Sequence, residues 1–222
     1  YPTAKSKDGV RQHVELAWSP DSYKWYRISP GTPLIAPTPT KETKYGKMPY
    51  DWGCIFPSTP IFRDGEIQIY HGASDWYFFD WRKGGLALAT LRPDGWAGYE
   101  QIDASKPATI TTTPLACVGT RLQVSADVST GGSLRVTILD KDKRELAVAA
   151  AIRQTVTDGE LVWPRAFSMK ALKGARICLK FEFKDTKLYS FNFTSPEDDK
   201  QVHAGNTAPA DLQKKLRVDA RP

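Results

Sequence analysis

Four segments of this chain alternate between apolar and polar residues, and this alternation limits the fold more than any other feature. A period of two places every second side chain on the same face, as in a β-strand that is buried on one side. The four segments span 66–71, 121–126, 133–139 and 176–183. We therefore predict an all-β protein.

Short clusters of turn residues, each with a glycine, separate the strand segments. They are Arg63-Asp-Gly, Pro93-Asp-Gly, Thr130-Gly-Gly and Thr157-Asp-Gly. The stretch 144–153 is rich in alanine, which favours a helix. Because it lies between strands and is bounded by turn residues, we predict a strand with a bulge there. A short helix is predicted over 208–216.

The pattern of the sequence changes near Asp103. Residues 104–113 form a linker-like stretch of Ser, Pro and Thr, and strand signals then recur about every ten residues, as in a β-sandwich. We predict three parts: a first domain over 1–103, a β-sandwich over 104–194 and a polar tail over 195–222. Trp163 is expected in the core of the sandwich.

Composition excludes several functional classes. The net charge of +6 is scattered along the chain, so we predict no nucleic-acid interface. No apolar run is long enough to cross a membrane, and no membrane partner is predicted. The three cysteines stand in apolar surroundings without a Cys-x-x-Cys motif, which favours buried free thiols and no metal site. No motif requires a cofactor.

A weak repeat indicates the architecture of the first domain. Leu16-Ala and Leu88-Ala are each followed by a Pro-Asp turn and then by an aromatic residue, about 70 residues apart. Each unit reads as a strand, a turn closed by the Asp side chain and a ring that packs between neighbouring sheets. This pattern is typical of radially repeated blades.

Three strings resemble glycoside hydrolases of families 32 and 43, which fold as five-bladed β-propellers. Residues 15–27 resemble one blade, 50–73 the next and 85–96 the one that follows. In the second string, an Asp-x-Gly segment leads into a strand that ends Tyr-His-Gly. Gly132 to Val136 and Leu188 to Phe191 are similar to parts of a sandwich often appended to such enzymes.

The resemblance implies the closing blades of a partial propeller followed by a β-sandwich, in a secreted or periplasmic protein. It implies a carbohydrate substrate and a role as part of a glycoside hydrolase. Residues 1–103 supply about one and a half to two of the five blades. We therefore expect a second polypeptide or a missing N-terminal segment to complete the ring, because open sheet edges invite pairing. The alternative is a non-catalytic carbohydrate-binding or interaction module.

Glycoside hydrolysis uses two carboxylates on opposite sides of the scissile bond. The catalytic candidates are Asp51, Glu15 and His71. Substrate contacts are expected from the aromatic and charged residues near them, namely Trp52, Asp75, Trp76, Trp81 and Arg82. Aromatic rings stack on sugar rings, carboxylates accept hydrogen bonds from hydroxyl groups, and an arginine suits an acidic sugar.

Each candidate also has a structural interpretation. Glu15 fits a surface charge or a charge between blades, and Asp51 fits a turn before a strand. His71 fits a structural histidine whose hydrogen bonds are satisfied. The loop with Asp75 and Trp76 is also consistent with a loop whose side chains fill the core of its own domain.

Overall fold

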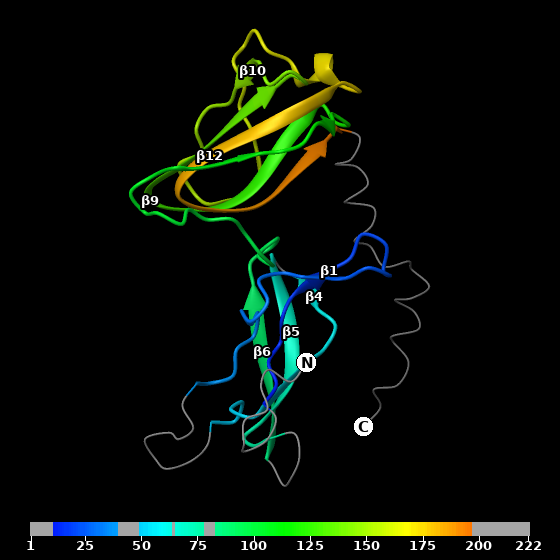
Figure 1. The fold of residues 1–222 in the computed structure, drawn as a ribbon, viewed down its shortest axis with the longest axis vertical. Coiled ribbons are helices and arrows are strands. Elements are labelled where there is room, and N and C mark those ends of the chain that lie inside the picture. The colour runs from blue at the N-terminus through cyan, green and yellow to red at the C-terminus, as the bar shows by residue number, and fades with distance from the viewer. Residues whose placement is uncertain (1–10, 40–48, 64, 78–82, 197–222) are drawn as a thin grey trace, which may run out of the picture. The chain divides into compact units, whose positions relative to one another are not determined.

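The computed structural model describes residues 11–39, 49–63, 65–77 and 83–196 (Figure 1). The predicted helix over 208–216, most of the predicted tail, and Trp81 and Arg82 lie outside these residues. The described chain is all-β, as predicted: its strands form several sheets, none of them closed, and one 3-10 turn, η1, spans Met169–Leu172. No helix in these residues is long and apolar enough to cross a membrane.

The chain divides into two compact units between Ala97 and Gly98, a few residues before the predicted boundary near Asp103. A reason for this position is that Tyr99 already bridges to Leu188 of the second unit. The first unit holds β1 Ala17–Trp18, β2 Tyr26–Arg27, β3 Cys54–Pro57, β4 Ile61–Arg63, β5 Glu66–Ser74 and β6 Gly84–Leu91.

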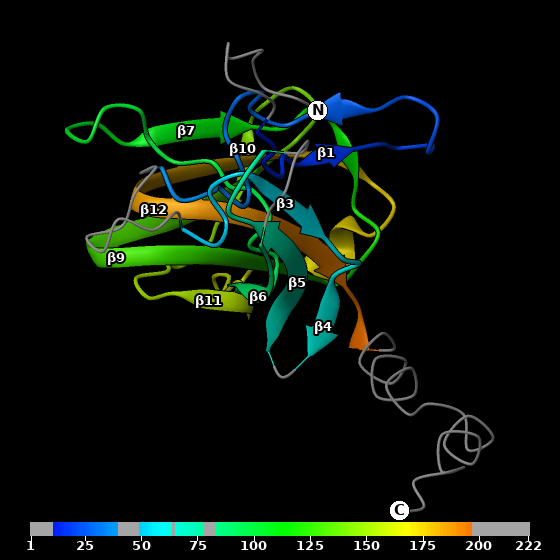
Figure 2. The ribbon, with the colours of Figure 1, turned by 90° about the horizontal axis from the view of Figure 1, so that it is seen from below.

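The central strand of the first unit is β5 (Figure 2). It pairs on one side with β6 and on the other with β3 and then β4, which lie one after the other along it. Its apolar residues follow the predicted alternation: Ile67, Ile69 and Ala73 are buried, whereas Tyr70 is exposed. One face of this sheet is therefore packed and the other is open. β1 and β2 form a separate two-stranded sheet.

The second unit is built on two long strands, β9 and β12, which run antiparallel side by side (Figures 1 and 2). Four short strands flank them. The strands of this unit are β7 Ala108–Thr111, β8 Leu115–Ala116, β9 Arg121–Leu139, β10 Glu145–Val148, β11 Val156–Glu160 and β12 Arg176–Thr194. Within the predicted stretch 144–153, β10 occupies Glu145–Val148, and its ladder shifts register between Glu145 and Ala147. The predicted strand with a bulge is therefore confirmed for the first half of the stretch.

The predicted turns at Thr130-Gly-Gly and Thr157-Asp-Gly were wrong. β11 runs through the second with a register shift between Val156 and Gly159, and β9 continues through the first as a bulge. Ser133 pairs with Lys184 and Val128 pairs with Thr186, so residues 129–132 leave the ladder opposite Asp185 alone. Asp185 has φ 47° and Gly131 has φ 80°, a region that glycine enters without cost. The bulge divides each strand into two halves.

Both halves of β9 and β12 contribute to one hydrophobic core. Leu122 and Val124 come from the first half of β9, and Val136 comes from the second. Phe181 and Leu188 come from the two halves of β12. The bulge lets the sheet bend around this core instead of running flat. Trp163 packs against the same core, as predicted.

All three cysteines are buried free thiols, as predicted. Cys54 belongs to the first unit, and Cys117 and Cys178 belong to the second. Burial raises the pKa of the Cys117 thiol, which keeps it protonated and unreactive at neutral pH.

We predict that Gly132→Ala destabilises the second unit, because the added Cβ would lie 2.4 Å from the carbonyl oxygen of Asp185. Overpacking of this kind costs about 1–3 kcal/mol, and urea unfolding measures it. Ser129→Ala is the control, since Ser129 is exposed in the same bulge and adds no backbone contact. Equal stability of the two variants would contradict the close approach.

Candidate functional site

Two strand ends meet in the first unit, where β3 begins and β5 ends. Cys54 pairs with Ser74, and the N–H of Gly53 donates to the carbonyl oxygen of Ser74 at 2.8 Å. A Cβ on Gly53 would lie only 1.7 Å from the carbonyl oxygen of Trp76, so only glycine fits this position. We call the residues on either side of this junction, Asp51, Trp52, Asp75 and Trp76, the Asp51 corner.

Asp51 is 8% exposed, which is unusual for a carboxylate. Its Oδ2 accepts a hydrogen bond from the N–H of Thr38 at 3.2 Å. Its Oδ1 is buried and has no hydrogen-bond partner within the described part of the chain. Buried polar atoms without a partner are rare in native proteins, and they are costly. Asp51 therefore keeps one acceptor position that the described residues leave empty.

The aromatic rings of the corner pack on one another. The Trp52 ring lies 6.0 Å from that of Trp76 and 5.0 Å from that of Tyr77, the latter edge to face. The Arg11 guanidinium lies 4.4 Å from the centre of the Trp52 ring, and Arg11 Nε donates to the Trp52 carbonyl at 2.7 Å. Trp52 is thus 5% exposed, whereas Trp76 is half-buried. Trp76 has the more accessible ring for stacking.

Asp75 closes the loop that follows β5. Its Oδ1 accepts a hydrogen bond from the N–H of Lys83 at 2.7 Å, and its own N–H donates to the Lys83 carbonyl at 3.2 Å. This carboxylate therefore has a structural task, as a residue that shapes a loop. Its substrate contact stays a prediction.

His71 lies on the packed face of the sheet, opposite Pro57 and Ala87. It is 5% exposed, and its Nδ1 lies 3.4 Å from the Ile69 carbonyl oxygen, a long contact. Three residues of strand separate it from Ser74, which corresponds to roughly 10 Å. His71 is therefore set back from the Asp51 corner along β5, and its catalytic role stays a prediction.

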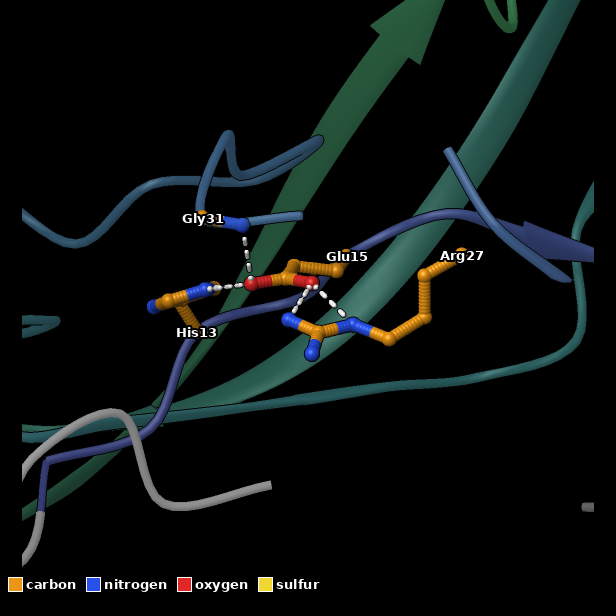
Figure 3. A network of polar contacts seen from close by, with 4 residues as sticks. All are labelled: His13, Glu15, Arg27 and Gly31. Atoms are coloured by element: carbon orange, nitrogen blue, oxygen red, sulfur yellow. Dashed lines mark hydrogen bonds and ion pairs between the residues drawn. The ribbon is translucent and has the colours of Figure 1, made fainter. Parts of the chain in front are cut away.

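Glu15 is the centre of a different group, shown in Figure 3. Its Oε1 lies 2.8 Å from His13 Nε2 and accepts the N–H of Gly31 at 3.1 Å. Its Oε2 accepts from Arg27 Nε at 2.9 Å and from Arg27 Nη2. These hydrogen bonds, from His13 first and then from Arg27, lower the pKa of Glu15 from 4.5 to about 2. Glu15 is therefore ionised at neutral pH and has no proton to donate as a general acid.

The structure thus brings four of the predicted residues together and separates two. Asp51, Trp52, Asp75 and Trp76 meet at one end of the sheet, whereas Glu15 and His71 have other neighbours. Arg11 and Thr38 were missed by sequence reasoning, because no local pattern links them to Asp51 or Trp52. Among the described residues, no group of three His, Cys, Asp or Glu side chains could hold a metal ion.

Comparison with known proteins adds no relative. No protein-family model, curated protein or solved structure matches this chain. The resemblance to propeller glycoside hydrolases therefore depends on the sequence strings alone, and functional conclusions depend on the geometry of the site.

We predict that Gly53→Ala disrupts the corner, because the added Cβ would collide with the Trp76 backbone. The loss of unfolding free energy is expected to be about 3 kcal/mol or more. Tryptophan fluorescence during urea unfolding reports on it, since six of the seven tryptophans precede Gly98. Gly72→Ala in the same sheet is the matched control: a Cβ there meets nothing within 4 Å, and stability should hardly change. If Gly53→Ala leaves the free energy of unfolding unchanged, residue 53 does not approach the Trp76 carbonyl as closely as described.

The pKa of Glu15 predicts how stability depends on pH. Because the pKa of about 2 lies below the ordinary 4.5, ionised Glu15 stabilises the folded chain above about pH 4.5, and this contribution is lost as the pH falls toward 2. Urea midpoints of the wild type and of Glu15→Gln should therefore differ at pH 5 and converge near pH 2. A difference that stays constant across this range would contradict the lowered pKa.

Proposed function

We propose that this chain is part of a glycoside hydrolase that acts on an oligo- or polysaccharide, and that Asp51 is one of its two reacting carboxylates. The observation that supports this most is the buried Oδ1 of Asp51, which has no partner in the described chain. Hydroxyl groups of a saccharide are hydrogen-bond donors of the kind that this oxygen lacks. The proposal assigns the empty acceptor position to the substrate.

The surroundings of Asp51 suit a sugar. The half-buried ring of Trp76 follows the end of β5, whereas Asp51 precedes the start of β3, and these two strand ends meet. A ring next to a carboxylate combines an apolar surface with a hydrogen-bond acceptor. Arg11, placed over the other tryptophan, Trp52, holds that ring in position. The corner therefore has the few well-placed polar groups and the aromatic lining that are typical of ligand sites.

The second carboxylate of such a site must come from elsewhere. Glu15 is engaged by His13, Arg27 and Gly31, and Asp75 holds Lys83. Of the carboxylates assigned to the site, Asp51 alone keeps a buried oxygen without a partner among the described residues. We therefore propose that sheets outside these 222 residues, from a further segment or a second polypeptide, complete the site.

The open face of the first sheet supports such a partner. Phe56, Tyr70, Leu86 and Leu88 are exposed on this face, and Leu86 is 78% exposed. The strand β6 at its edge has no charge and no proline over eight residues, so it lacks the devices that keep edges unpaired. An apolar sheet face beside an open edge is suited to packing against another sheet.

A second candidate is a carbohydrate-binding module without catalysis. The paired state of Glu15 favours it: of the described carboxylates assigned to the site, only Asp51 has an oxygen without a partner, and one such carboxylate can bind a sugar but cannot supply both acid and base. The secreted or periplasmic location stays a prediction of the family resemblance.

Replacement of Asp51 by asparagine tests the proposal. Asn retains an oxygen for the Thr38 N–H but removes the charge, so the fold should remain while hydrolysis of oligosaccharides by the native particle is lost. Asp21→Asn is the control, because Asp21 is an exposed carboxylate of the same unit that, within the described chain, accepts hydrogen bonds only in its own turn, so turnover should remain. If the native particle with Asp51→Asn hydrolyses oligosaccharides at the wild-type rate, Asp51 takes no part in the chemistry. Retention on polysaccharide without turnover in the wild type would favour the binding module.

The mass of the native particle tests the partner. We expect it to exceed the 24.8 kDa of these 222 residues, and denaturing mass spectrometry should then assign the excess to one longer chain or to a second polypeptide. A native particle of 24.8 kDa would exclude both and leave the apolar face unexplained.

A further inference from the structure

The outer face of the sheet in the second unit carries a group of basic residues that the proposed site does not use. Arg135 is on β9 and Lys184 is on β12, where Ser133 pairs with Lys184 and Arg135 pairs with Glu182. Arg153 follows Ile152, which bridges Leu134 on the other side of β9. Since Leu134 and Phe183 point into the core, Arg135, Lys184 and Arg153 are on the opposite, exposed face.

These three cations surround a hollow. It has a volume of about 300 Å³, and it is lined by Arg135, Arg153, Lys184, Ser133 and Glu182 together with Pro107, Ala151 and Phe183. Lys184 lies on one side of Ser133, in β12, and Arg153 lies on the other, beside the bridge of Ile152 to Leu134, so their backbones are roughly 10 Å apart. We call this surface the Arg135 face.

The charges of the Arg135 face are not balanced within the described chain. Arg135, Arg153 and Lys184 form no ion pair there, and the one acid of the hollow, Glu182, pairs with Lys180 at 2.9 Å. Arg135 faces Glu182 and Lys184 faces Ser133 across the ladder, so the hollow is lined by three cations and one carboxylate, and that carboxylate is shared with Lys180. The face therefore keeps a net positive charge that would attract an anion into the hollow.

The arginines narrow the choice of anion. A guanidinium group binds carboxylate, sulfate or phosphate through two parallel hydrogen bonds, and two such groups beside a lysine suit a ligand with repeated negative charges. The shallow, exposed sheet face favours an extended chain over a small molecule.

We propose that the Arg135 face binds an anionic polysaccharide through its carboxylate or sulfate groups. The assignment to a saccharide depends on the proposed function, whereas the assignment to a polyanion depends on the Arg135 face alone. The face would hold the polymer, and the Asp51 corner would contact a sugar unit independently.

Affinity electrophoresis of the full 222-residue chain in gels with polygalacturonate, dextran sulfate or a neutral glucan tests this. The wild type should be retarded by at least one anionic polymer, with retardation that falls as salt is added. The triple variant R135A/R153A/K184A should lose about tenfold or more in affinity, because charge-assisted hydrogen bonds are lost. The single variants R135Q and K184Q should each show part of this loss of affinity. They keep the proposal testable if the triple variant fails to fold.

The matched control is K143A/K170A/K173A. It removes the same three positive charges from exposed positions of the same unit, outside the hollow, and should bind nearly as the wild type does. An equal loss in both triple variants would show a general charge effect and overturn the proposal. The proposal would also be overturned if the wild type were retarded by neither anionic polymer, or if it bound DNA at least as tightly as it binds these polymers.

The Asp51→Asn variant separates this inference from the proposed function. It should keep its retardation by the anionic polymer if the Arg135 face is the binding surface, even though turnover is lost. If Asp51→Asn abolishes retardation and the Arg135 variants do not, the polymer binds at the Asp51 corner and the Arg135 face has no such role.

Discussion

The candidate site depends on one close backbone contact, between Gly53 and the carbonyl of Trp76. A side chain on residue 53 would occupy the space of that carbonyl, so the start of β3 can meet the end of β5 only through glycine. The contact brings Asp51 and Trp52 next to Asp75 and Trp76, more than 20 residues later in the chain. Two acid–aromatic pairs that are separate in sequence thereby become one corner, with a buried Asp51 oxygen that no described residue satisfies.

The strands were predictable because each buries one face. The alternation over 66–71 and 176–183 reappears within β5 and β12, and the alanine-rich stretch 144–153 contains β10 with its bulge. The turn at Thr130-Gly-Gly was not predictable, since glycines mark both a hairpin turn and a bulge. The difference depends on pairing with Asp185, some 50 residues away. Whether these sheets complete a propeller and a sandwich stays a prediction.

The site was predictable only in part, and for a similar reason. Adjacent acids and tryptophans marked Asp51 and Asp75, because those neighbours are local in sequence. The partners that decide what each carboxylate can do are distant: Arg27 is twelve residues from Glu15, and Thr38 is thirteen from Asp51. The cations of the Arg135 face are also scattered in sequence, and only the register of β9 with β12 gathers them. Scattered charge therefore gave no sign of a basic surface.

The central claim is that the empty acceptor position on Asp51 belongs to a saccharide. Carbon-13 NMR of the chain labelled at aspartate carboxyl carbons tests it most directly, by following the Asp51 signal, assigned with Asp51→Asn, as oligosaccharides are added. We expect the Asp51 resonance to shift and saturate with the sugar, while the resonance of Asp140, in the other unit, stays in place. A saccharide that binds without moving the Asp51 signal would contradict the account.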